Sequence, residues 1–448
     1  MREIVGIFAV LPLLTWLLTY KKHRDIAEPY NLFTFLYFIN IMIPMILYIN
    51  VETSEKISEL YIRNAVLNDS TFIIYAILQT TSYYLVIFGM KLRITNLKNN
   101  IQNKKNVSIM YDSKKYKCIG IIMWIIGAIS FLLIMKKVGG IYYFFTHLQY
   151  RVSLTRNLDV LSWILPFINY GVLAIAYSYR GTNKSINFKI IALAIISGIM
   201  SGLGGRKALI ILLIEVLLIY HYCVKEISIK KFLKFKYILG IIVIYLFFIV
   251  MPKFRVEGAF EIFAQNPIEF IKQSNNGILS TIRSESYVTY YITIIEYFKT
   301  HSFWFGKTFL GLKTAIIPSS IFPDKPPVDD GTYLYSISQG RTDIIPPMPF
   351  NKLDGSSLPL ETFGSMYGNF GIVGLFLGMI ILGVIYKYTY KRMKEKSYNF
   401  FDVIIYIQVI FTFQLSTLRI FQIFEMIVVL WIISFIMDKF ILKKDKTR

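Results

Sequence analysis

The chain has 448 residues, of which 55% are hydrophobic, 16% are aromatic and only 17% are charged. Apolar runs near the roughly 20 residues that cross a bilayer recur along it, which excludes a soluble domain with one anchor and predicts a polytopic membrane protein. The net charge of +22 does not indicate nucleic-acid binding, because the basic residues lie between apolar runs, where membrane orientation and anionic lipids account for them.

Eleven apolar segments are predicted to form transmembrane helices in an all-α bundle. The first precedes the basic sequence KKHR, has almost no basic residues before it and has no convincing small-residue cleavage site, so a retained helix is expected rather than a secretion signal. The predicted helices are 4–20, 31–50, 70–90, 118–135, 160–179, 190–203, 208–224, 237–252, 364–386, 402–418 and 421–437.

The distribution of Lys and Arg predicts the orientation. Six segments between or after these helices hold 29 of the 49 basic residues, and they alternate with basic-poor segments. Positively charged loops remain on the cytoplasmic side, so the N-terminus is expected outside and the C-terminus inside. The six segments are 21–30, 91–117, 180–189, 225–236, 387–401 and 438–448.

The predicted topology divides the chain into three regions. Residues 1–252 form a bundle of about eight helices, and residues 364–448 form three more helices with a cytoplasmic tail. Between them, residues 253–363 are expected to be one large external loop. It mixes amphipathic pieces such as PIEFIKQ with proline-rich turns such as IIPSSIFPDKPPVDDG. Within it, the sequence leaves open whether 287–322 re-enters the membrane.

Charged residues at the predicted external ends of helices are the first candidates for a functional site. Ionisable groups at membrane depth are costly and usually face a cavity or a partner, although helix capping and contact with lipid head groups are the plainer alternatives. The planar fork of arginine can bind a phosphate group through two parallel hydrogen bonds. These residues are Arg206, Lys207, Arg255, Glu257, Arg283, Glu285 and Arg419.

In both Arg-x-Glu pairs, the residues would point to different sides if the segment were helical. Glu257 and Glu285 would then not need to neutralise Arg255 and Arg283 and could interact with another group.

The segment LDGSSLPLETFGSMYGNFGIVGLFLG contains one carboxylate, Glu361, at the start of an expected helix. Two roles are open for this residue: a favourable charge in the first helical turn, or a general base at the rim of an external cavity. Five glycines follow, at 364, 368, 371, 374 and 378. On a regular helix they form a stripe about 120° wide with Tyr367 beside it, which predicts a surface for close helix packing.

Neither a metal nor another cofactor is expected. Cys118 and Cys223 cannot form a disulfide framework and do not resemble a zinc site. Asp329 and Asp330 in PVDDGTY are expected first of all to form a turn, with metal binding as the alternative.

Several short segments together suggest a family. SGLGGRKALI, PKFRVEG, IIPSSIFPDKPP and SSLPLETFGSMYGNFGIVG occur in this order in a chain rich in Tyr, Phe and Ile. With the helix layout and the large external loop, they resemble the O-antigen and oligosaccharide repeat-unit polymerases (Wzy-type). Arg206, Arg255 and Glu361 match this pattern best, whereas Arg283 and Arg419 depend mainly on the predicted topology.

The resemblance implies a membrane-embedded, metal-independent, inverting glycosyltransferase with a GT-C-like architecture. Its donor would be a glycan on undecaprenyl pyrophosphate, and its acceptor a single lipid-linked repeat unit. The site would face the outside of the bacterial cytoplasmic membrane, where nucleotide sugars are absent. Fixed arginines could stabilise the departing pyrophosphate, and a carboxylate could assist the attacking hydroxyl. Membrane lipids, a flippase and a chain-length regulator are the expected partners.

Two other functions remain open on the sequence. An O-antigen ligase would use the same chemistry with another acceptor. A flippase or other transporter for lipid-linked oligosaccharides is expected to have paired halves and shorter loops. The sugars, the linkage, the oligomeric state and the destination of the polymer are not encoded in any recognisable motif.

Overall fold

The computed structural model describes residues 2–20, 25–50, 64–66, 68–92, 113–155, 158–182, 188–227, 247, 250–251, 253–274, 286–317 and 321–442. Every regular element within these ranges is helical. Seven helical segments in the described ranges are long and apolar enough to cross a membrane, and three shorter helices are also apolar. The protein is therefore a multi-pass membrane protein whose described part is all-helical.

These ten segments correspond to ten of the eleven predicted helices. The seven longer ones are Pro29–Ile49, Asp69–Lys91, Ser113–Val138, Val160–Tyr177, Arg206–Val224, Glu361–Glu395 and Thr417–Phe435, and the shorter ones are Glu3–Thr19, Phe188–Gly202 and Phe400–Thr412. The eleventh predicted helix, 237–252, lies largely outside the described residues. The predicted bounds were too narrow for α20 (Glu361–Glu395), which has 35 residues.

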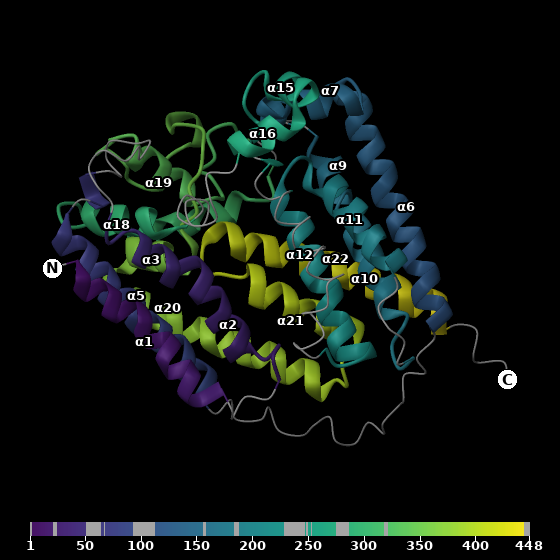
Figure 1. Ribbon diagram of the computed structural model, residues 1–448, viewed down its shortest axis with the longest axis horizontal. Coiled ribbons are helices and arrows are strands. Elements are labelled where there is room, and N and C mark those ends of the chain that lie inside the picture. The colour runs from purple at the N-terminus through teal and green to yellow at the C-terminus, as the bar shows by residue number, and fades with distance from the viewer. Residues whose placement is uncertain are drawn as a thin grey trace. The chain divides into compact units, whose positions relative to one another are not determined.

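The chain divides into two compact units. The first unit comprises residues 1–97, 279–397 and 408–448. Figure 1 shows its long helices α1 (Glu3–Thr19), α5 (Asp69–Lys91) and α20 side by side. Its other elements are α2 (Pro29–Tyr37), η2 (Phe38–Met42), α3 (Ile43–Leu47), α18 (Val288–Tyr297), η5 (Lys307–Thr314), α19 (Gly331–Ser338), η6 (Phe350–Lys352) and α22 (Thr417–Leu442).

Helices α5 and α20 cross closely because glycines lie at the crossing. A Cβ atom at Gly89 would collide with the backbone oxygen of Ile380, and one at Gly383 would collide with that of Val86. Close approach of two backbones in this way is typical of small residues in membrane helices. The predicted use of glycine for close packing is thus present in this unit, at positions outside the predicted stripe.

The predicted glycine stripe itself is interrupted, because Gly371 has φ 65° and ψ −152° and breaks the regular course of α20. The carbonyl oxygens of Gly368 and Asn369, just before the break, accept hydrogen bonds from the backbone N–H groups of Trp304 and Phe305 at 3.0 and 2.8 Å. A Cβ atom at Gly368 would press on Trp304 and Phe298, not on another long helix. The prediction of one smooth packing stripe assumed a regular helix and was wrong for this reason.

The second unit comprises residues 98–278 and 398–407. Helices α6 and α10 approach each other at Gly120, Gly127 and Gly171, where a Cβ atom would collide with the facing backbone. Its elements are α6 (Ser113–Val138), α7 (Ile141–Thr146), η3 (Leu148–Tyr150), α8 (Arg151–Thr155), α9 (Asp159–Ile164), α10 (Phe167–Tyr177), α11 (Phe188–Gly202), α12 (Arg206–Ile219), η4 (Tyr220–Val224), α15 (Ala259–Gln265) and α16 (Pro267–Ser274). Helix α21 (Phe400–Thr412) has residues in both units.

The segment 287–322, whose relation to the membrane the sequence left open, contains α18 and η5. Helix α18 has ten residues and is buried along most of its length. It is too short to cross the hydrocarbon core, which requires about 20 residues.

Candidate active site

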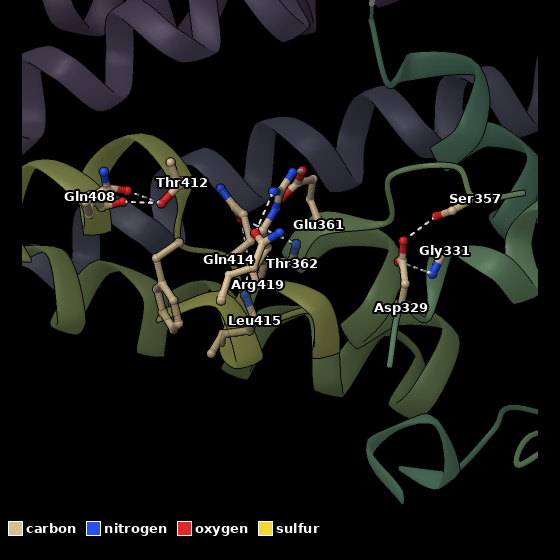
Figure 2. Close-up of polar contacts among 12 residues, drawn as sticks. Asp329, Gly331, Ser357, Glu361, Thr362, Gln408, Thr412, Gln414, Leu415 and Arg419 are labelled. Carbon is tan, nitrogen blue, oxygen red and sulfur yellow. Dashed lines mark hydrogen bonds and ion pairs between the residues drawn. The ribbon is translucent and has the colours of Figure 1, made fainter. Parts of the chain in front are cut away.

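A largely buried ion pair joins the starts of α20 and α22. Figure 2 shows Glu361 and Arg419 reaching toward each other from these two helices. Nη2 of Arg419 donates to Oε1 of Glu361 at 2.8 Å, and Nε donates to Oε2 at 3.4 Å. The Arg419 and Glu361 side chains are 15% and 12% exposed, so this two-point interaction is largely shielded from water.

The backbone around Glu361 is held in an uncommon conformation. Glu361 has a φ of 48°, in the left-handed region that residues with a side chain rarely adopt. Such conformations cost on the order of 1–3 kcal/mol and are often found at functional sites. The next residue, Thr362, donates to Gln414 Oε1 at 2.6 Å and accepts from the backbone N–H of Leu415 at 2.8 Å. These bonds fix the start of α20 to the connection between α21 and α22.

A small pocket of about 130 Å³ opens beside the ion pair. It brings together three carboxylates, one guanidinium and two hydroxyl groups from three segments of the first unit. The lining residues are Asp329, Asp330, Glu361, Arg419, Ser357 and Ser416, with Pro359, Leu360 and Leu418 as the apolar part of the wall.

The two aspartates that precede α19 have different environments. Asp330 is 1% exposed, accepts from Ser365 Oγ at 2.5 Å and from the backbone N–H of Thr417 at 3.4 Å, and so connects the three helices α19, α20 and α22. Burial raises its pKa to about 7, against the lowering effect of the Ser365 hydrogen bond. Asp329 is only partly buried and accepts from Ser357 Oγ and from the backbone N–H of Gly331. Burial raises its pKa as well.

Glu361 is the first residue of α20, so its charge lies in the first helical turn, as one of the two alternatives expected. The carboxylate is also bound by Arg419. Its role as a general base remains a prediction.

Four other predicted site residues belong to the second unit. Arg206 begins α12, and Lys207 after it is exposed. Arg255 Nη2 donates to the carbonyl oxygen of Gly204 at 3.3 Å, so the structure brings together the segments SGLGGRKALI and PKFRVEG. Glu257 lies exposed in a turn after Arg255. Because residues 254–258 are not helical, the expectation that Arg255 and Glu257 point to different sides of a helix does not apply to them.

Tyr367, the remaining predicted site residue within the described ranges, does not line the pocket. Tyr367 is 8% exposed and packs edge-on against Phe303, with ring centroids 5.8 Å apart. Its ring also lies nearly parallel to that of Phe363. It belongs to an aromatic cluster in the first unit. Arg283 and Glu285 lie outside the described residues, and their assignment stays a prediction.

Ser357 and Gln414 were not predicted as site residues, and Asp329 was expected first of all in a turn, with metal binding as the alternative. PVDDGTY does form a turn into α19, as expected, and the same turn places Asp329 in the pocket wall. The two adjacent acidic residues before a glycine were the feature of the sequence from which Asp329 could have been predicted as a site residue. Within the described ranges, no group of three or more His, Cys, Asp or Glu side chains is arranged to hold a metal ion. The pocket offers a fixed cation and a partly exposed carboxylate, which suit stabilisation of an anion and acceptance of a proton.

Comparison with known proteins supports the family suggested by the short motifs. The family model described as "Putative O-antigen polymerase" matches residues 29–291, which is more than half of the chain and includes Arg206 and Arg255. No curated protein and no solved structure matches the chain. Membership of this family implies a glycan-polymerising transferase that uses lipid-linked repeat units. The chain, a multi-pass membrane protein of a bacterial polysaccharide pathway, therefore belongs to the O-antigen polymerase family.

Proposed function

We propose that this protein is a repeat-unit polymerase that moves a growing glycan from undecaprenyl pyrophosphate onto a lipid-linked repeat unit. The family match carries this proposal. The largely buried Glu361–Arg419 pair beside a polar pocket supports it, because a fixed guanidinium suits the charge that develops on a departing pyrophosphate.

The proposed reaction is an inverting transfer without a metal. A hydroxyl oxygen of the acceptor sugar attacks the anomeric carbon of the donor and forms the new glycosidic bond. The bond from this carbon to the pyrophosphate oxygen breaks, and its electron pair leaves with undecaprenyl pyrophosphate. Arg419 in the first unit, and Arg206 with Arg255 in the second, are the proposed groups that recognise pyrophosphate. Membrane lipids surround the enzyme, and a flippase and a chain-length regulator are its proposed partners.

The reaction is proposed to take place at the outer face of the bacterial cytoplasmic membrane, with eleven spans, the N-terminus outside and the C-terminus inside. The 29 basic residues in six alternating segments support this orientation. Residues 253–363, which include Asp329 and Ser357, are then external.

This orientation predicts which positions an impermeant thiol reagent can reach in intact cells (or spheroplasts, where an outer membrane is present). Cysteines at the exposed positions Asn351 and Ser356 should react, and one at the exposed Lys396 should react only after the membrane is opened. The background variant replaces Cys118, which is exposed, by serine; Cys223 is buried and serves as an internal control. Labelling at Lys396 with protection at the other two positions would reverse the orientation.

Deletion of the gene separates the proposed function from its alternatives. Loss of a polymerase should leave surface glycan with single repeat units, and externally accessible lipid-linked repeat units should accumulate. Full-length polymer retained on the lipid carrier would instead indicate a ligase. Repeat units confined to the cytoplasmic leaflet would indicate a flippase. The length ladder of surface polysaccharide and the sidedness of the lipid-linked units are the two measurements, and plasmid-borne wild-type protein is the control.

A further inference from the structure

We propose that Asp329 is the catalytic base that accepts the proton of the acceptor hydroxyl, while Glu361 is a positioning residue for Arg419. This inference deepens the proposed polymerase function and depends on it. It gives the two carboxylates different tasks, although both line the same pocket.

The hydrogen bonds of the two carboxylates support this division. Both carboxylate oxygens of Glu361 accept hydrogen bonds from the Arg419 guanidinium, so the Glu361 side chain is engaged in holding Arg419. Asp329 is held by a neutral hydroxyl and a backbone amide: Ser357 Oγ donates to Oδ2 at 2.6 Å, and the N–H of Gly331 donates to Oδ1 at 2.9 Å. Each of these oxygens retains a further lone pair for a substrate hydroxyl.

Asp330 does not suit the role of base, although it also lines the pocket. Its side chain is almost completely buried and is bound to Ser365 and Thr417, so it serves to join three helices. Asp329 is only partly buried. A base must come within hydrogen-bond distance of the reacting hydroxyl, and this favours Asp329 on geometry.

Charges around Asp329 also favour this assignment. Burial has the largest effect on the pKa of Asp329 and raises it, and the negative charge of Glu361 raises it further. The hydrogen bonds from Ser357 and Gly331 and the positive charge of Arg419 lower this pKa. Asp330 is the other titratable group beside it in the pocket. The net effect on the pKa of Asp329 is upward, and a raised pKa makes a carboxylate a more effective general base.

In the proposed step, the proton of the acceptor hydroxyl moves to the Asp329 carboxylate while the hydroxyl oxygen bonds to the anomeric carbon. The carbon–oxygen bond to pyrophosphate breaks, and its electron pair leaves with the lipid pyrophosphate near Arg419. Asp329 then loses the proton to water. No oxidant, reductant or further reactant is needed.

The test uses purified full-length protein in liposomes that contain the lipid extract of a gene-deletion strain, which supplies the native lipid-linked repeat units. The rate of polyprenyl-pyrophosphate release is measured from pH 5 to pH 9. The wild-type rate should fall toward low pH as the base becomes protonated. Asp329→Asn should lower the rate by about 10²-fold or more and abolish this decline.

Ser357→Ala provides a second measurement on a protein that keeps the carboxylate. Removal of the hydroxyl that stabilises the charged form should shift the decline in rate to higher pH. Glu361→Gln should lower the rate and move the decline to lower pH without abolishing it, because the charge of Glu361 raises the pKa of Asp329. Asp324→Asn is the matched control, because Asp324 is an exposed carboxylate that binds Asn351 outside the pocket, and it should behave as wild type.

A near-normal rate for Asp329→Asn would overturn the assignment, and so would a Glu361→Gln variant that alone loses the decline at low pH. In the second case Glu361 is the base. An unchanged pH profile for Ser357→Ala would also contradict the assignment of Asp329 as the base. If wild-type protein releases no polyprenyl pyrophosphate from this extract, the proposed function itself fails, which is distinct from failure of Asp329.

Discussion

Replacement of Arg419 by lysine should lower the rate of polymerisation by about 10²–10³, although the positive charge is retained. The guanidinium binds Glu361 through two nitrogens and Gln422 Oε1 through a third, at 3.0 Å. A lysine ammonium is a point charge on a flexible stem and cannot reproduce this fork. Lysine still neutralises Glu361, so the large destabilisation expected from an unpaired buried charge is avoided.

The measurement is the length ladder of surface polysaccharide, read beside the membrane level of each variant. Arg341→Lys is the matched control, because Arg341 is a partly buried arginine of the predicted external loop 253–363 that pairs with Asp343 away from the pocket. Its ladder should be normal. A normal ladder from Arg419→Lys would show that only charge is required there. The same exchange at Arg206 and Arg255 then decides whether the second unit recognises the pyrophosphate.

Replacement of Gly371 by alanine should destabilise the first unit by several kcal/mol and remove activity. Its φ of 65° with ψ of −152° lies in a region that is accessible almost exclusively to glycine, and forcing another residue there costs about 1–3 kcal/mol. The added Cβ atom would also lie 3.0 Å from the ring of Phe303. A shift of the break would move Glu361, ten residues earlier, away from Arg419.

Gly355→Ala is the matched control, because it adds a side chain at a positive φ without the contact that alanine at Gly371 would make with Phe303. Gly355 also has a positive φ, of 68°, but a Cβ atom there meets nothing within 4 Å. It should lower the melting temperature of the detergent-solubilised protein only slightly, whereas Gly371→Ala should lower it strongly. Equal, small shifts would show that α20 accommodates alanine at the break.

The helices could be predicted from the sequence because apolar length is a strong local signal. The same signal does not reveal a break inside an apolar run, and α20 shows why. Gly371 is one of five glycines in that segment, and what distinguishes it is Trp304 and Phe305, whose N–H groups bind the carbonyls freed by the break. Such a contact depends on residues more than sixty positions apart.

The candidate site could be predicted only in part, for the same reason. Glu361 and Arg419 were each recognisable as charges at helix ends, but their pairing depends on the connection that Thr362 fixes through Gln414 and Leu415. Asp329 was recognisable as part of a turn. Its position beside Arg419 follows from the bond between the Asp330 carboxylate and the start of α22.

The course of α20 has a consequence for how substrates arrive. After the break at Gly371, its residues 372–395 extend roughly 36 Å at about 1.5 Å per residue, enough to cross a hydrocarbon core of about 30 Å. In the proposed orientation the part before the break, which begins with Glu361, then lies at the outer surface of the membrane. The pyrophosphates of the proposed donor and acceptor are confined to this surface by their polyprenyl chains. Encounter with the enzyme is then a two-dimensional process, and saturation should depend on the number of carriers per membrane area rather than on their bulk concentration.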